Sequence, residues 1–244
     1  MASWIVHLRI AEVLLATIPG LEARAFAIGN VAPDSGVPDA NWDKFDPPPE
    51  ITHFRIRTAS SRRSADLEFF RRYLLPLRSQ ANDAARLSFH LGYFFHLVTD
   101  NLWIDDIYLP TRSRFAGQFA DDSRFIWEVK RDWYGLDLEY VRTQPESIFW
   151  RVFLSGRYTE DYLDFLPRDA IRQSLDYIKA FYQRTDEEME QRYGRRPDLY
   201  LSRPEMDDFV TRTAKRLLGI HGYLWQDGAV PPQASSILDL PIPG

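Results

Sequence analysis

The segment from Leu87 to Trp103 limits what this chain can fold into more than any other. It reads LSFHLGYFFHLVTDNLW and is almost entirely apolar, yet it carries two histidines and an aspartate in its interior. Such a run predicts a long buried helix, which we place near residues 82–103. On a helix, His96 and Asp100 share one face, about one turn apart. Burying an imidazole beside a carboxylate costs free energy unless a partner compensates. The pair therefore predicts either a metal site or a private hydrogen bond between the two side chains.

The rest of the sequence predicts an all-α protein. Helical periodicity is widespread, and the alternation typical of strands is scarce. We expect a multi-helix bundle around the central helix, in a single metal-binding domain over residues 1–227, followed by a proline-rich tail over 228–244. Besides the central helix, helices are expected near 3–17, 21–28, 64–75, 121–133, 144–155, 159–183, 185–193 and 204–219.

Composition narrows the chemistry and the partners. The chain has 244 residues and no cysteine, which excludes disulfide bonds, thiolate nucleophiles and thiolate metal sites. Any metal must be held by nitrogen and oxygen donors, which suits Zn²⁺, Mn²⁺ or Fe²⁺. The formal net charge of −5 disfavours stable nucleic-acid binding.

The N-terminal segment predicts a cytoplasmic location. It lacks the basic region that begins a secretory signal, and Arg9 and Glu12 interrupt its apolar run. No uninterrupted apolar run of about 20 residues exists, so we expect no transmembrane segment.

Metal-competent side chains are concentrated before residue 101. Besides the His96/Asp100 pair, they are His7, Asp34 and His53. Helical bundles build metal sites from side chains that project inward from different elements. Each residue also has a structural alternative: His7 fits a core histidine, Asp34 a turn after proline, and His53 a helix cap.

These residues fall, in order, in four short motifs. The motifs are Trp4-x-x-His7, Gly29-Asn30-x-x-Pro33-Asp34, Thr52-His53-Phe54 and Gly92-Tyr93-x-x-His96-x-x-x-Asp100. Their order and spacing resemble the bacterial zinc-dependent phospholipase C family, which is similar in architecture to the single-strand-specific zinc nucleases of fungi and plants. The resemblance covers roughly the first 105 residues.

The resemblance implies an all-helical fold with a metal cluster between helices. It implies that one metal is held by Asp34, His53, His96 and Asp100. A second metal would contact His7, with Asp100 bridging the two.

The sequence departs from the family pattern after Asp100. No histidine occurs between His96 and His221, and Trp4 is internal rather than terminal. One or two metal ions are therefore expected rather than three. Candidate additional ligands are Asp105 and Asp106, near the position of the next family ligand, and His90 on the central helix.

The expected function is hydrolysis of a small-molecule or lipid phosphoester by a metal-activated water. Asp34 is expected to orient that water. Arg55 and Arg57 follow His53 closely, and either guanidinium can grip a phosphate, although both also fit a solvated face. Tyr93 is expected to line the substrate pocket, with core packing as its alternative.

Two other functions fit the same residues. One is a non-hydrolytic metalloenzyme, for example an iron enzyme of specialised metabolism. The other is a non-catalytic module that a metal stabilises, because a fold does not determine a function.

Overall fold

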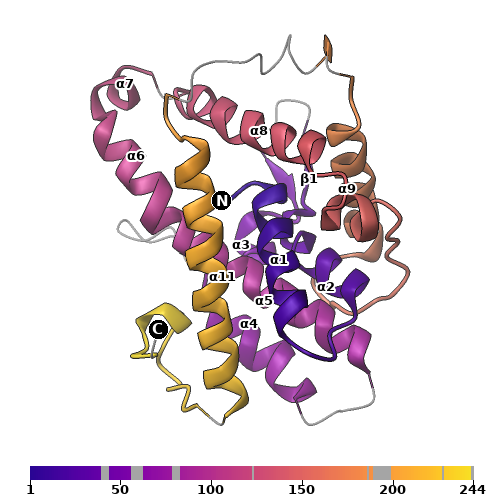
Figure 1. Cartoon of the computed structure of the whole chain (residues 1–244). Coiled ribbons are helices and arrows are strands. Elements are labelled where there is room, and N and C mark those ends of the chain that lie inside the picture. Colours follow the sequence, from indigo (N-terminus) through magenta and orange to yellow (C-terminus); the bar gives the residue numbers. More distant parts are fainter. Residues whose placement is uncertain are drawn as a thin grey trace.

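The computed structural model describes residues 1–39, 44–55, 63–78, 83–122, 124–185, 187–188, 199–226 and 228–242. In these residues helices supply nearly all of the regular structure, which confirms the expected all-α class (Figure 1). The strands described are β1 (Val37–Pro38) and β2 (Phe45–Asp46), which pair antiparallel. Among the described helices, none is both long enough and apolar enough to cross a bilayer.

The described α-helices differ widely in length. They are α1 (Trp4–Thr17), α2 (Ala23–Gly29), α3 (Pro49–Thr52), α4 (Asp66–Phe69), α5 (Ala84–Trp103), α6 (Leu109–Arg114), α7 (Ala116–Asp121), α8 (Ile126–Thr143), α9 (Arg168–Tyr182) and α11 (Arg203–Trp225). Short 3₁₀ turns are η1 (Ala32–Asp34), η3 (Leu75–Leu77) and η6 (Ile237–Asp239). Wider π-helical turns are η2 (Phe70–Leu74), η4 (Ile104–Tyr108) and η5 (Phe149–Phe153).

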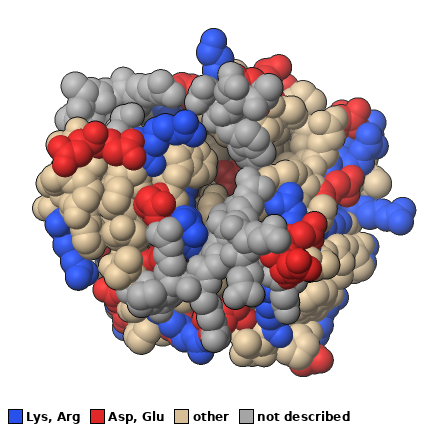
Figure 2. Space-filling model, turned by 90° about the horizontal axis from the view of Figure 1, so that it is seen from above, with Lys and Arg blue, Asp and Glu red and all other residues tan. Residues whose placement is uncertain are grey.

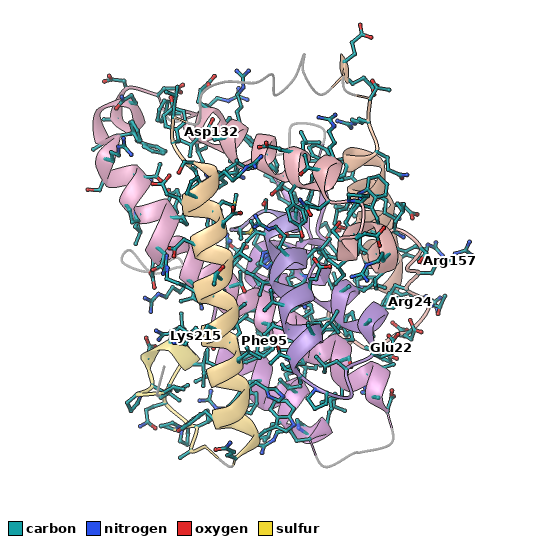
Figure 3. All side chains as sticks on the ribbon, in the orientation of Figure 1. Glu22, Arg24, Phe95, Asp132, Arg157 and Lys215 are labelled. Atoms are coloured by element: carbon teal, nitrogen blue, oxygen red, sulfur yellow. The ribbon has the colours of Figure 1, made fainter. Side chains whose placement is uncertain are left out.

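Helix α5 lies at the centre of the protein. Its N-cap is Asp83, whose carboxylate accepts the backbone N–H of Arg86. Every residue from Ser88 to Trp103 is buried, including Phe95 in the interior (Figure 3). A helix that is apolar on all sides must be covered on all sides. Helices α1, α2, α4 and α11 pack around it, and Figure 1 shows α11 (orange) beside α1, with α8 crossing near the N-terminal end of α1.

Helices α2 and α5 cross so closely that two glycines are required. A Cβ atom on Gly92 would lie 2.5 Å from the backbone oxygen of Phe26, and one on Gly29 would lie 2.1 Å from that of Phe89. Neither contact can be relieved by rotating a side chain, because backbone atoms form both. The crossing brings Asn30, the residue that ends α2, against α5.

The helices after α5 depart from the sequence prediction. The chain continues helically through Pro110, which occupies the first turn of α6. Proline is tolerated in the first turn of a helix, and this turn directly follows the π-helical turn η4. Helix α8 begins later than the helix expected at 121–133 and runs beyond it, and α9 begins only after Pro167, not at 159. The helix expected at 185–193 lies largely outside the described residues.

The proline-rich C-terminal segment is anchored to the core by Asp66. The Asp66 carboxylate accepts hydrogen bonds from the Ser236 hydroxyl at 2.6 Å and the Ile237 backbone N–H at 2.8 Å. It also accepts one from the side-chain amide of Asn101 at 2.9 Å. Because Asp66 is fully buried, its burial raises its pKa to about 7 although these hydrogen bonds favour the anion.

Gly92→Ala should destabilise the protein by about 1–3 kcal/mol, since the new methyl group forces the two backbones apart. Gly135→Ala is the matched control: a Cβ there meets nothing within 4 Å, and the change should raise stability by up to about 1 kcal/mol. Urea denaturation measures both. Equal effects of the two substitutions would contradict the close crossing.

The Asp66 carboxyl should make stability fall as the pH rises. Its pKa is about 7 in the folded protein and 3.8 ordinarily. The folded state therefore holds the proton more tightly than the unfolded chain, and this stabilisation is complete below about pH 4 and is lost as the pH rises through about 7. Urea denaturation from pH 4 to 8 should show a smaller decline for Asp66→Asn than for wild type. The exposed control Asp121→Asn should leave the decline unchanged, and a wild-type decline in Asp66→Asn would refute this assignment.

Candidate metal site

Five side chains from four segments converge beside α5. His7 comes from α1, Asp34 ends η1, His53 directly follows α3, and His96 and Asp100 project from α5. The side chains of four are at most 2% exposed, and that of Asp34 is 9% exposed. The convergence expected from the sequence is therefore present, and it joins segments almost 100 residues apart.

The donor atoms of four of these residues lie close to one another. The Nε2 atom of His53 lies 3.2 Å from Oδ1 of Asp34 and 3.3 Å from Nε2 of His96. Oδ2 of Asp100 lies 3.7 Å from the first imidazole nitrogen and 3.8 Å from the second. Tetrahedral coordination with bonds of about 2.1 Å places donors about 3.4 Å apart. The separations of 3.2 and 3.3 Å match that spacing, and the two that involve Asp100, 3.7 and 3.8 Å, are slightly longer.

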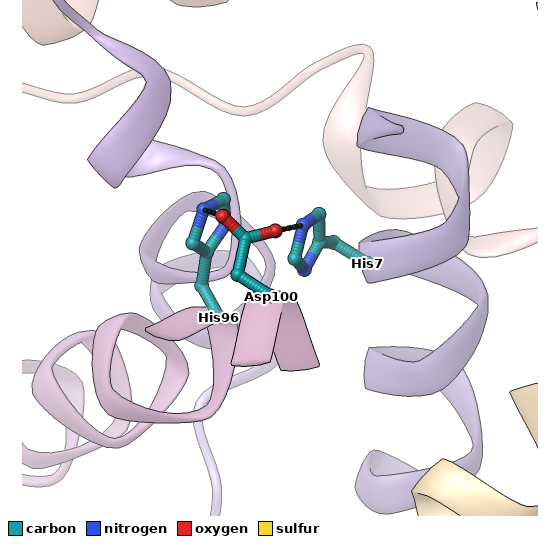
Figure 4. A group of neighbouring side chains, drawn as sticks. All are labelled: His7, His96 and Asp100. Atoms are coloured by element: carbon teal, nitrogen blue, oxygen red, sulfur yellow. Dashed lines mark ion pairs between the residues drawn. The ribbon is translucent and has the colours of Figure 1, made fainter. Parts of the chain in front are cut away.

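His7 extends the cluster on the other side of Asp100. Its Nε2 atom lies 3.4 Å from Oδ1 of Asp100, an oxygen that also accepts the backbone N–H of Ala2 at 2.9 Å. The rings of His7 and His96 stack with centroids 3.8 Å apart. Figure 4 shows one oxygen of the Asp100 carboxylate directed toward His7 and the other toward His96. Two groups of potential ligands result, one with His7 and Asp100 and the other with Asp34 and His53, and both include His96.

The cluster contains buried polar atoms that have no hydrogen-bond partner. They are both ring nitrogens of His7 and Oδ2 of Asp100. Such atoms destabilise a folded protein by about 1–3 kcal/mol each when nothing binds them. A cation bound between imidazole nitrogens and carboxylate oxygens would satisfy one ring nitrogen of His7 and the Oδ2 atom of Asp100, so the residues present fit a metal ion. The buried histidines and aspartates can hold one.

Backbone carbonyls and a hydroxyl orient two of the imidazoles. Nδ1 of His96 lies 2.8 Å from the carbonyl oxygen of Asn30. Because a carbonyl only accepts, this nitrogen carries the hydrogen, and Nε2 presents its lone pair to the cluster. Nδ1 of His53 lies 2.9 Å from the hydroxyl of Thr52, whose carbonyl in turn accepts the Tyr93 hydroxyl. Such outer partners are typical of histidines that bind metals.

The local electrostatics favour neutral imidazoles beside ionised carboxylates. Burial and the neighbouring His96 lower the pKa of His7 to about 4, against the attraction of Asp100. Burial also lowers the pKa of His53. Burial alone would raise the pKa of Asp100, but the ammonium group of Met1 and the nearby histidines hold it well below its usual range. For Asp34, burial is likewise outweighed by the hydrogen bond to His53, so its pKa is lowered. These are the protonation states that bind a divalent cation.

A strained residue sets the direction of the chain after His53. Phe54 has a φ of 51°, a left-handed conformation that L-residues avoid at a cost of about 1–2 kcal/mol. Its ring is held in edge contacts with Phe69, Tyr73 and Phe165. The aromatic packing maintains the turn, and the turn keeps the His53 imidazole against α5.

The other sequence candidates lie elsewhere or serve other purposes. Tyr93, expected to line a substrate pocket, is fully buried and stacks on Phe69, so it supports the His53 turn instead. The Nδ1 atom of His90 donates a hydrogen bond to the Arg86 carbonyl at 2.7 Å, and His90 is not among the grouped ligands. Asp105 forms an ion pair with Arg63, and Asp106 forms one with Arg212. Arg57 lies outside the described residues.

Lys130 on α8 was not singled out from the sequence, yet it belongs to the surroundings of the site. Burial lowers its pKa, the carboxylates of Asp34 and Asp100 raise it, and Arg55 lowers it again. Both site carboxylates therefore attract its ammonium group. The Nζ atom also lies 4.8 Å from the ring centre of Trp127. Half-buried Arg55 has a buried Nε atom without a hydrogen-bond partner. The one sequence feature that sets Lys130 apart is that lysine is rare: the chain has only four.

Asp34 is the most exposed of the five side chains, at 9%. The face of the molecule seen in Figure 2 is hollowed, with an acidic side chain at the bottom of the hollow and Lys or Arg side chains near its edge.

Comparisons with family models, with curated proteins and with solved structures found no match for this chain. The resemblance to the zinc-dependent phospholipase C family therefore stays a prediction from the motifs. The case for a function depends on the geometry of the cluster.

Zinc should bind to the purified protein with one or two equivalents, and Asp100→Ala should weaken binding by at least about tenfold, since removing even outer partners has that effect. Elemental analysis after dialysis against trace zinc measures the content. His221→Ala, a histidine stacked on Trp225 in α11, is the control and should bind as wild type does. Undiminished zinc in Asp100→Ala would rule out the site.

Proposed function

We propose that this protein is a metal-dependent hydrolase that cleaves a phosphoester, with a phospholipase C-like phosphodiesterase reaction. The observation that carries the proposal is the buried set of three imidazoles and two carboxylates with unpartnered donor atoms. A zinc ion, or Mn²⁺ or Fe²⁺, fits these donors. The chemistry that such an ion supplies is activation of water at neutral pH and neutralisation of phosphoryl charge.

The residues divide into ligands and groups that act on the substrate. His7, His53, His96 and Asp100 would hold one or two metal ions, since all four are buried. Asp34 would serve both purposes, because its partial exposure lets a carboxylate oxygen accept a hydrogen bond from the attacking water and orient it.

Two cations near the site would bind the phosphoryl oxygens. Lys130 feels the negative charge of Asp34 and Asp100, and Arg55 lies close enough to affect its pKa. Guanidinium and ammonium groups form strong hydrogen bonds to phosphate oxygens. They would also draw an anionic substrate toward two carboxylates that otherwise repel it.

The substrate would be a small-molecule or lipid phosphoester. The phosphoryl group would have to reach the buried cluster beside Asp34, while the rest of the substrate stays outside. It places no demand on nucleic-acid binding, which the net charge of −5 disfavours.

Wild-type protein with zinc or manganese should hydrolyse bis-p-nitrophenyl phosphate, and Lys130→Met should lower kcat/KM at least about tenfold because a charge-assisted hydrogen bond is worth about 1.5–3 kcal/mol. Zinc content should not change in Lys130→Met. Lys215→Met, an exposed lysine on α11, is the matched control and should retain wild-type activity.

Two results would overturn the proposal. One is a metal-loaded protein that turns over no phosphodiester but melts earlier when the metal is removed, as a metal-stabilised module would. The other is wild-type activity in Asp34→Asn, since that carboxylate is assigned to both the metal and the water.

A further inference from the structure

A second concave site lies between α9 and the segment 156–159. The pocket has a volume of about 480 Å³, within the usual range for small-ligand sites. From α9 it is lined by Arg168, Arg172, Asp176 and Lys179, which recur at helical spacing on one side of the helix.

This pocket is separate from the metal site. Ser174, also on α9, donates its hydroxyl hydrogen to the backbone carbonyl of Asp34 at 3.2 Å. Ser174 is two residues from both Arg172 and Asp176, so it points about 160° away from them around the helix. One side of α9 therefore supports η1, while the opposite side forms the pocket, with the helix between them.

The wall opposite α9 is held in place by packing. Tyr158 is buried, and its ring stacks on Phe89 of α5 with centroids 5.2 Å apart. The ammonium group of Lys179 donates to the carbonyl of Gly156, which fixes the start of the segment against α9. The shape of the pocket thus exists before any ligand binds, which reduces the entropy lost on binding.

The charges in the pocket are unbalanced. Four cationic side chains, Arg157, Arg168, Arg172 and Lys179, face one carboxylate, Asp176. This excess occurs in a chain whose net charge is −5, so it is not a consequence of overall composition.

Few of these cations have an anionic partner. Among the described residues, Arg172 pairs with Asp169 at 3.2 Å, whereas Arg168 reaches only the carbonyl of Thr159. Arg157 has no hydrogen bond or ion pair in that part of the chain. A concave surface with excess positive charge concentrates anions.

We propose that this pocket binds a phosphate group of a soluble or lipid-borne ligand, held by Arg157 and Lys179 with Arg168 at its edge. A guanidinium presents two parallel N–H donors to phosphate oxygens, and the ammonium of Lys179 keeps donors beyond the one used by Gly156. The site does not depend on the proposed hydrolase activity.

Isothermal titration of the full-length protein with inorganic phosphate, at constant ionic strength set with chloride, tests the site. Wild type should bind with a dissociation constant at or below about 1 mM. Arg157→Gln/Lys179→Gln should weaken binding at least about tenfold, since two charged donors are lost. Glutamine retains a donor for the Gly156 carbonyl, and circular dichroism confirms that the variant is folded.

A matched control locates the binding. Lys215→Gln/Arg216→Gln removes the same charge from α11, and Figure 3 shows Lys215 and Arg157 at opposite edges of the molecule. This variant should bind phosphate as wild type does. Wild-type affinity in Arg157→Gln/Lys179→Gln, or no binding by wild type, would overturn the proposal.

Glycerol 3-phosphate and vesicles containing phosphatidic acid distinguish the source of the phosphate group. Binding of either that is lost in Arg157→Gln/Lys179→Gln supports the site and assigns the group to a soluble or a lipid ligand. If Arg157→Gln/Lys179→Gln binds glycerol 3-phosphate and the vesicles as wild type does, the proposed site is contradicted.

Discussion

The close crossing of α2 over α5 is the constraint on which the metal site depends. Gly29 and Gly92 let the two backbones meet without side chains between them. This contact places the Asn30 carbonyl 2.8 Å from Nδ1 of His96, and that hydrogen bond turns the other imidazole nitrogen toward the cluster. The 3₁₀ turn that carries Asp34 follows immediately. Packing between backbones thus determines the direction of a lone pair, and through it the chemistry of the site.

The cluster would be an unfavourable arrangement without a cation. Two buried carboxylates lie beside three imidazoles whose ring nitrogens are needed as lone pairs, and several of these atoms have no partner. An apolar core of the same volume would be more stable. Asp100 has the largest share of these contacts, because one of its oxygens faces His7 and the other faces His53 and His96. A bound metal changes this arrangement from a source of instability into a source of stability.

The sequence identified the five side chains that converge, two from helical spacing and three from short motifs, but not their surroundings. The His96/Asp100 pair is visible because a helical repeat sets its geometry, and the central helix follows from its apolar length. Tyr93 was misplaced because a hydroxyl in an apolar run fits both a pocket and the core, and only the fold shows that the Thr52 carbonyl uses it. Lys130 was missed because its place depends on how α8 packs, which no local pattern encodes. Helical continuation through Pro110 needed the preceding π-turn, another feature without a sequence signature.

Diffraction at the zinc absorption edge, from crystals grown with zinc, tests the central claim most directly. The account predicts an anomalous peak within about 2.2 Å of Nε2 of His53, Nε2 of His96 and an oxygen of Asp100. A second peak beside His7 would show that the Asp100 carboxylate bridges two ions. Zinc found only at surface carboxylates, with the His53 and His96 imidazoles free of metal, would contradict the claim.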